Sequence, residues 1–329
     1  MPTDPPRLLD ELDLAIVHAL QLDSRAPWTK IAAAVGADSA TVSRRWEQMS
    51  EEALAWLTSW PKPAQWAEHA DAALVLLDAD ADIEAILALP WVLTVDETSA
   101  GVVVLVVSGS GLRDLGERVR RLSAAATPGP SAGVPRMHVV SAVLAEDSMW
   151  RTRALSPGGQ RILTPPRTSG TGRPPSTETV AELAAALGED PRMSAARLAE
   201  RLGVSEATAR RTVERAVAAD RLGLGCDLSA PAAGLRRGAM LWARSPRLDV
   251  AGASARRLPQ AYRVLEVVGP APLCVNVRVT TLTELPEVER ALGDEAEVVD
   301  RWTVLAVRKR NGHLLDDWGR SIGSVPVSW

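Results

Sequence analysis

The sequence predicts an α+β chain that contains two winged-helix or helix-turn-helix domains and two ferredoxin-like (βαββαβ) domains. The first observation is an internal repeat, because the pattern that begins at Leu20–Arg25 begins again, 167 positions later, at Leu187–Arg192. The second is a change of apolar periodicity, which is helical at the start of each copy and strand-like further on. Solenoid units run only roughly 20–50 residues, so a repeat this long duplicates whole domains.

Composition is that of a globular protein, with 46% hydrophobic and 24% charged residues among 329. The net charge of −4 argues against an overall basic coat but leaves room for a local basic face. Cys226 and Cys274 are too far apart for a metal motif and suggest no disulfide framework. The acidic, proline-rich Met1–Asp10 is no signal peptide, and the longest apolar run, Val102–Val107, is too short to span a membrane. We therefore expect a cytoplasmic protein with no membrane segment, metal or cofactor.

The first domain, residues 1–60, is predicted to contain three helices. Apolar residues recur at helical spacing in the first of them: Leu9, Leu12, Ile16 and Leu20. A second helix is expected at Trp28–Val35, and Gly36 suits the left-handed residue that ends it. Asp38 can cap a third helix that runs to about Met49.

The next domain, residues 66–148, changes to strand periodicity. Four strands are predicted at Ala73–Leu77, Trp91–Val95, Val102–Val107 and His138–Leu144. Two helices are predicted between them at Asp82–Leu89 and Leu112–Leu122. The order βαββαβ is that of a ferredoxin-like sandwich.

A linker rich in proline, glycine and serine, which could include one short helix, is expected at residues 149–176. After it the same order of domains is repeated. The second helix-turn-helix domain, residues 177–230, has predicted elements at Val180–Leu187, Ala195–Leu202, Glu206–Ala219 and Arg221–Leu228, the last a strand that could be a wing. The second ferredoxin-like domain, residues 236–310, has predicted elements at Met240–Ala243, Ala251–Leu258, Arg263–Val268, Leu273–Val279, Leu282–Leu292 and Val299–Val307. Residues 311–329 are left as a C-terminal tail.

The third helix of each copy is the candidate DNA-binding element. In a helix-turn-helix domain this helix lies in the major groove, and basic residues beside it neutralise phosphates. Local charge favours this role, because Arg192–Arg221 carries a net +3 and Arg25–Met49 a net +2. The pairs Arg44/Arg45 and Arg210/Arg211 are expected to make the main contacts. The predicted DNA-binding residues are Ser39, Thr41, Ser43, Arg44, Arg45, Thr208, Arg210, Arg211 and Arg215.

Two alternatives stay open for these helices. A solvated helix face with i,i+4 ion pairs, such as Glu206 with Arg210, produces the same pattern. Glu206 would also repel a phosphate, so whether both copies bind DNA is left open.

These segments resemble the Lrp/AsnC (feast/famine) family of bacterial transcription regulators. The resemblance rests on Leu12–Ile16, Leu20–Arg25 and Thr41–Arg45, and it covers most of the chain, twice. It implies a helix-turn-helix domain followed by a ferredoxin-like effector domain, called RAM, in a sequence-specific regulator of double-stranded DNA. Family members ordinarily carry one such set per chain and dimerise.

The tandem arrangement predicts how the RAM domains assemble. In the family two RAM sheets pack across a dimer axis, and here one linker tethers both. Such a linker holds the second domain at a local concentration on the order of millimolar. We therefore expect an intrachain RAM–RAM pseudo-dimer, and leave a further homodimer open.

A small-molecule effector is expected near the turns that hold Gly101 and Gly269. Glycine lets backbone N–H groups approach a carboxylate or another small polar group, and Arg263 and Glu266 favour the second copy. The aspartate that usually follows this glycine in the family is missing from both copies. A buried ammonium needs a countercharge, so ordinary amino acids are expected to bind weakly. The alternative is that both glycines only make tight hairpins.

The remaining alternatives concern enzymes and protein partners. Some relatives of the family decarboxylate sirohaem with pocket histidines and arginines, but this chain has only four histidines. No phosphate loop, nucleophile elbow or zinc spacing occurs, so no catalytic residue is assigned and the protein is expected not to be an enzyme. A partner that pairs with a regulator without binding DNA itself is the other alternative.

Overall fold

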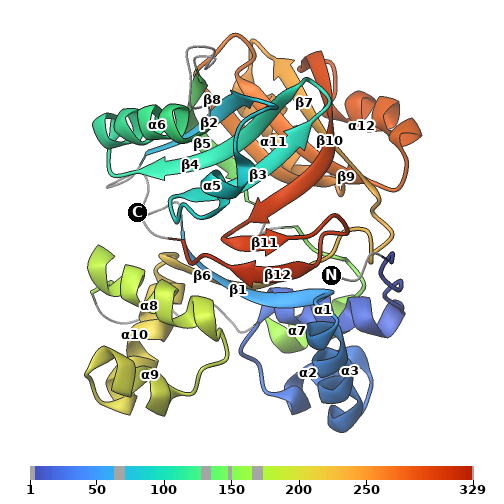
Figure 1. Cartoon of the computed structure of the whole chain (residues 1–329). Helices are drawn as coiled ribbons and strands as arrows, with labels where there is room; N and C mark the ends of the chain where they lie inside the picture. Colours follow the sequence, from blue (N-terminus) through green and yellow to red (C-terminus); the bar gives the residue numbers. More distant parts are fainter. Residues whose placement is uncertain (1–3, 63–70, 127–134, 147–149, 165–172, 328–329) are drawn as a thin grey trace.

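Two helical domains lie side by side beneath a β-barrel in the computed structural model (Figure 1). The structure describes residues 4–62, 71–126, 135–146, 150–164 and 173–327. Parts of the predicted linker, including Ser169–Gly172, lie outside these ranges. No helix in the described ranges is long and apolar enough to cross a membrane.

Each helical domain contains three helices and one strand. The first has α1 (Glu11–Leu22), α2 (Trp28–Val35), α3 (Ser39–Glu51) and β1 (Ala55–Pro61). The second has α8 (Thr177–Glu189), α9 (Ala195–Leu202), α10 (Glu206–Ala218) and β6 (Leu222–Leu228). Gly36 and Gly203 end α2 and α9 at φ 77° and 64°, the left-handed conformation that makes the sharp turn into the next helix.

Strands β1 and β6 join the two copies rather than forming separate wings. They pair antiparallel, and the central pair is Thr58 with Gly225, which are equivalent positions 167 residues apart. The ribbon therefore has a local twofold axis at this pair. The indole of Trp60 lies over Gly223, where any Cβ would overlap the ring. This close approach explains a glycine inside a strand.

The two RAM-like domains follow the predicted order. The first consists of β2 (Asp71–Asp78), α5 (Ile83–Leu87), β3 (Val92–Thr98), β4 (Val102–Gly109), α6 (Leu112–Ala126) and β5 (Arg136–Ala145). The second consists of β7 (Arg237–Arg244), α11 (Leu248–Arg257), β8 (Ala261–Val267), β9 (Leu273–Val279), η2 (Leu282–Glu284), α12 (Leu285–Leu292) and β10 (Glu297–Arg310). Their sheet orders, β3-β4-β2-β5 and β8-β9-β7-β10, are equivalent.

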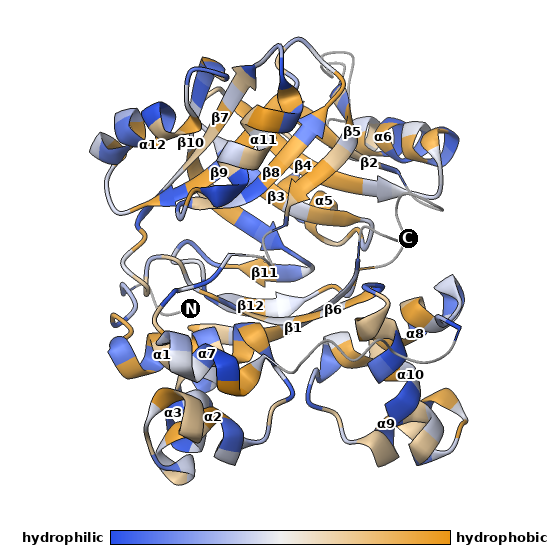
Figure 2. Cartoon of the chain, turned by 180° about the vertical axis from the view of Figure 1, so that it is seen from behind, coloured by the Kyte–Doolittle hydropathy of each residue, from blue (hydrophilic) through white to orange (hydrophobic). Residues whose placement is uncertain are grey.

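The two four-stranded sheets close into one barrel within the chain. Strand β5 pairs with β8 and β10 pairs with β3, so each domain supplies an edge strand to the other. The helices cover the outer faces (Figure 2). Apolar side chains of both domains, such as Leu74, Leu265 and Trp242, form one buried cluster. Lys309 of β10 is fully buried and donates to the carbonyls of Leu87 and Leu89, at the end of α5. The expected intrachain pseudo-dimer is therefore present.

The predicted linker and tail both contain regular structure. Within the linker, α7 (Pro157–Leu163) packs on α2, and the Leu155 N–H donates to the buried His18 ring at 2.9 Å. Beyond β10, β11 (His313–Leu315) and β12 (Ser321–Ser324) extend the sheet. The N–H of Ser321 also donates to Ala53, between α3 and β1. The C-terminal strands thus tie the barrel to the first helical domain.

Candidate functional site

The two helix-turn-helix units are held together by a reciprocal pair of arginines. Arg25 donates to the carbonyls of Pro191 and Met193 at 2.5 and 2.8 Å. Its equivalent, Arg192, donates to the carbonyls of Ser24 and Ala26, both at 2.8 Å. Burial lowers the pKa of both guanidinium groups below its usual value. Each arginine therefore donates to the backbone of the equivalent segment in the other copy. These reciprocal hydrogen bonds hold α3 and α10 as a symmetric pair.

The second copy exposes two of its four predicted contacts. Arg210 and Arg211 are exposed on α10, and the Thr208 side chain is engaged with Ser205 at the helix N-terminus, with 2.8 Å between the hydroxyl oxygens. Arg215 is half-buried and donates to the Arg211 carbonyl at 3.3 Å. Arg210 and Arg211 are therefore the side chains of this set best placed to reach DNA.

The first copy presents a smaller basic surface. Arg44 is exposed on α3, and 167 positions later its equivalent is Arg211. Ser39 and Thr41 are half-buried in the first turn of α3. Ser43, which corresponds to Arg210, donates to Glu47 at 3.1 Å. Arg44 is thus the exposed cation of this predicted set.

Arg45 does not lie free on the DNA side of α3, as the sequence prediction assumed. It binds Asp10 at 2.7 Å and the buried Asp13 at 3.2 Å, and so ties α3 to α1. In the second copy the positions of Asp13 and Arg45 are taken by Val180 and Thr212, both buried. The ion pair of one copy is replaced as a unit in the other, which is expected of a structural contact. The two arginine pairs are therefore not equivalent, since only Arg44 and Arg211 share a position.

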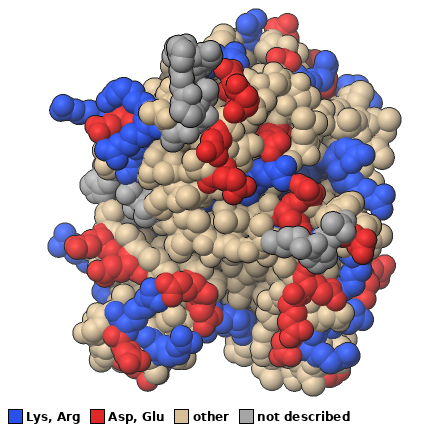
Figure 3. Space-filling model, viewed as in Figure 1, with Lys and Arg blue, Asp and Glu red and all other residues tan. Residues whose placement is uncertain are grey.

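Acidic residues lie among these arginines. Figure 3 shows blue and red groups interspersed over both helical domains rather than a continuous basic face. Glu206 is exposed at the start of α10, and Glu189 holds Arg201 through two contacts of 2.5 and 2.6 Å. The basic surface of each copy is therefore narrow.

The turns of the predicted effector site pack against neighbouring strands. At the β3–β4 turn, Gly101 has φ 70°, and the neighbouring Ser99 exchanges two 2.9 Å hydrogen bonds with Thr303 of β10. A Cβ at Gly269 would lie 2.5 Å from the His138 ring, so that turn is covered by a side chain. Both turns are packed on neighbouring strands, and an effector site beside them stays a prediction.

The two charged residues proposed beside Gly269 lie apart from each other. Arg263 is buried and contacts Asp96 at 3.3 Å, which connects β8 of one domain to β3 of the other. Glu266 accepts from the Ser141 hydroxyl at 3.2 Å, across the β5–β8 edge. Both side chains join the two halves of the barrel.

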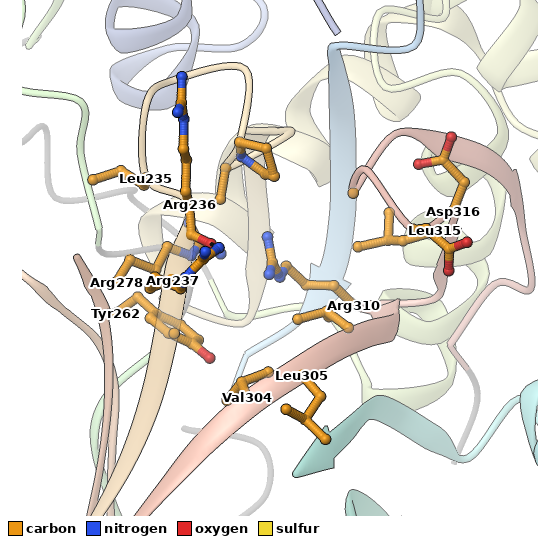
Figure 4. Close-up of a pocket in the computed structure, with 16 residues that line it drawn as sticks. Leu235, Arg236, Arg237, Tyr262, Arg278, Val304, Leu305, Arg310, Leu315 and Asp316 are labelled. Carbon is orange, nitrogen blue, oxygen red and sulfur yellow. Dashed lines mark hydrogen bonds between the residues drawn. The ribbon is translucent and has the colours of Figure 1, made fainter. Parts of the chain in front are cut away.

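Sequence reasoning missed an arginine-lined cavity at the base of the barrel. It has a volume of about 120 Å³ and lies between the strand ends of the second RAM-like domain and the segments after β6 and β11 (Figure 4). Arg278 and Arg310 contribute buried side chains, each 4% exposed, and the buried Tyr262 ring lies beside both. The guanidinium carbons are 4.4 and 5.8 Å from the Tyr262 ring centre. An arginine in the apolar strand Leu273–Val279 was the available signal.

Comparison with known proteins identifies the helical units. The AsnC-type helix-turn-helix domain family matches residues 9–50 and 178–216. The chain therefore contains two AsnC-type helix-turn-helix domains in an α+β fold. These two matches are consistent with a tandem Lrp/AsnC-like arrangement. No curated protein sequence matches the chain.

Solved structures share the arrangement at low sequence identity. The siroheme decarboxylase NirDL, in co-complex with an iron-uroporphyrin III analogue, is similar with a TM-score of 0.54 and 13% identity, over 92% of this chain and 93% of that one. AsnC of E. coli matches with a TM-score of 0.35 and 22% identity, over 38% of this chain and 89% of that one.

The first of these similarities corrects one expectation. The sequence led us to expect a protein that is not an enzyme, and that expectation is wrong, because an enzyme shares the fold over nearly the whole chain. At this identity the similarity shows the fold alone.

Proposed function

We propose that the protein is a sequence-specific DNA-binding transcription regulator of the Lrp/AsnC type. The observation that carries the proposal is the symmetric clamp between Arg25 and Arg192, which sets the two helix-turn-helix units as a fixed pair. Dimeric helix-turn-helix proteins read two half-sites with such a pair. In this chain the pair is intramolecular, so one chain supplies both recognition helices.

Equivalent exposed arginines support the proposal. Arg44 and Arg211 occupy the same position of the repeat, and Arg210 is exposed beside the second of them. A guanidinium group can contact phosphates or donate two hydrogen bonds to a guanine edge. The acidic residues around these arginines weaken nonspecific attraction, which favours binding that depends on sequence.

The test is selection of genomic DNA fragments by the full-length protein, followed by anisotropy titrations of the best fragment at several salt concentrations. R44A/R211A should weaken binding by about 1–3 kcal/mol for each base that an arginine no longer reaches, and should reduce the salt slope by about 1 for each phosphate that is no longer neutralised. The control is R256A/R257A, which removes two exposed arginines from α11. No selected fragment, or equal affinity of R44A/R211A and wild type, would contradict the proposal.

An enzyme that acts on a carboxylated tetrapyrrole is the second candidate. The arginine-lined cavity favours it, because guanidinium groups bind carboxylates. Incubation with sirohaem or iron-uroporphyrin III, followed by mass spectrometry of the tetrapyrrole, detects loss of carbon dioxide. Turnover would support this candidate. Binding to DNA without turnover would support the regulator.

A further inference from the structure

The arginine-lined cavity stands out because of its charge. Four arginines line it: Arg236, Arg237, Arg278 and Arg310. The lining includes two acids, Asp316 and Asp317, which also contact arginines outside the lining: Arg320 at 2.7 Å and Arg308 at 2.5 Å. The cavity therefore offers more positive than negative groups to a ligand.

The arginines in the buried part of the cavity are held in place by contacts with neighbouring side chains. Arg278 of β9 and Arg310 of β10 both lie beside the Tyr262 ring (Figure 4). Asp227 of β6 is 3.6 Å from Arg310. Arg236 and Arg237 are the exposed arginines of the lining, and Arg237 lies beside Arg278 (Figure 4).

Size restricts the ligand. A volume of about 120 Å³ is below the roughly 300–1,000 Å³ of sites for drug-sized molecules, so the cavity holds a small molecule or one acidic arm of a larger one. Planar guanidinium groups match the geometry of carboxylates, with which they form paired hydrogen bonds.

The cavity also lies at the joint between the barrel and the DNA-binding pair. Part of its lining belongs to the barrel strands β7, β8, β9 and β10, whereas the lining residues between 230 and 236 belong to the segment that connects β6 to β7. Within that segment Ala232 packs in the core of the first helix-turn-helix domain and accepts from the Leu9 N–H at 2.8 Å. Ser229 donates to the Trp318 carbonyl at 2.7 Å. A ligand in the cavity therefore contacts both parts of the molecule.

We propose that this cavity binds a small carboxylate anion through Arg237, Arg278 and Arg310. Binding there changes the position of the helix-turn-helix pair relative to the barrel and so changes affinity for DNA. The binding step stands by itself, whereas the regulatory step rests on the proposed function. The shared chemistry is the carboxylate, whether it belongs to a free dicarboxylic acid or to the side chain of a tetrapyrrole.

Calorimetric titration of the full-length protein with succinate, glutarate and tricarballylate tests the binding step. At least one acid should bind, and the neutral analogue succinamide should not. R237A should weaken binding on the order of tenfold, since it removes one charge-assisted hydrogen bond at an exposed position. R278K keeps the buried positive charge but lacks the planar guanidinium group that donates two parallel hydrogen bonds. It should therefore weaken binding about as much as R237A does. R256A/R257A is the control for overall charge.

The outcomes separate the steps. Failure of all three acids and of iron-uroporphyrin III to bind, equal binding of succinamide, or wild-type affinity in both R237A and R278K would overturn the site. Iron-uroporphyrin III that binds in a manner sensitive to R237A would identify a tetrapyrrole arm as the source of the carboxylate and support the site. Anisotropy with the selected DNA, with and without the acid, tests regulation. Unchanged DNA affinity would overturn the regulatory step alone, and absence of DNA binding would overturn the proposed function while the carboxylate site stands.

Discussion

Replacing Arg45 should destabilise the first helix-turn-helix domain rather than weaken DNA binding directly. Its side chain is 29% exposed and holds Asp10 and the fully buried Asp13, so R45A removes one of two cations around Asp13. Arg7 remains, at 2.7 Å from that carboxylate. The destabilisation is therefore smaller than the roughly 3–5 kcal/mol of leaving a buried charge without any partner.

The magnitude follows from the two ion pairs that Arg45 makes. The exposed pair with Asp10 contributes about 0.2–1 kcal/mol, and a hydrogen bond to a charged buried group about 1.5–3 kcal/mol. We expect R45A to cost about 2 kcal/mol. Grafting the residues of the second copy as D13V/R45T should cost less than the sum of its single variants, by about 1 kcal/mol or more, because Val180 and Thr212 make a compatible pair there.

Native-state hydrogen exchange of full-length protein measures this locally. Amides of α1 and α3 should exchange faster in R45A, while those of α8 and α10 serve as an internal reference within the same chain. R44A is the matched variant, since Arg44 is exposed and should change stability by no more than about 0.5 kcal/mol while weakening DNA binding. Unchanged exchange in R45A, or additive destabilisation in D13V/R45T, would refute a structural role for this ion pair.

Three further changes have defined outcomes. R25A and R192A should weaken DNA binding by similar factors in anisotropy titrations, because each removes half of a symmetric clamp; an effect confined to one of them would argue against the clamp. Burial, with the nearby Arg151 and Arg153 charges, lowers the pKa of His18 from 6.5 to about 4, so the unfolded state takes up more protons between these values. The contribution of His18 to the free energy of unfolding should be complete above pH 6.5 and fall by up to about 3 kcal/mol as pH drops toward 4. In denaturant titrations, H18L should lower the free energy of unfolding at neutral pH and reduce its dependence on pH. G223A should lower the melting temperature, because its Cβ overlaps the Trp60 ring, and adding W60A should recover part of the stability. An unchanged melting temperature of G223A would show that the β1–β6 ribbon accommodates the added methyl group.

Local elements of this fold could be predicted from sequence because their causes are local. The helical spacing of apolar residues predicted α1. Gly36 and Gly203 predicted the turns into α3 and α10, because those turns need a residue in the left-handed conformation whatever surrounds it. The duplicated order of strands and helices predicted two ferredoxin-like units. The same reasoning could not tell that Arg221–Leu228 pairs with the other copy, because a strand pattern does not name its partner.

Contacts between distant segments were decided only by the tertiary structure. Arg45 looks like a recognition-helix cation until α1 brings the buried Asp13 to within 3.2 Å of it. Arg278 looks like a single charge in an apolar strand, and Arg310 looks like the end of the basic run Arg308–Arg310. They line one cavity only because β9 and β10 pack against the segment after β6. Sequence pattern reports which face of an element is buried, whereas charge pairing and cavities depend on which elements meet. That information is in the packing of the whole chain. Most helices and strands were therefore predicted from the sequence alone, whereas β1, β11, β12 and the arginine-lined cavity were not.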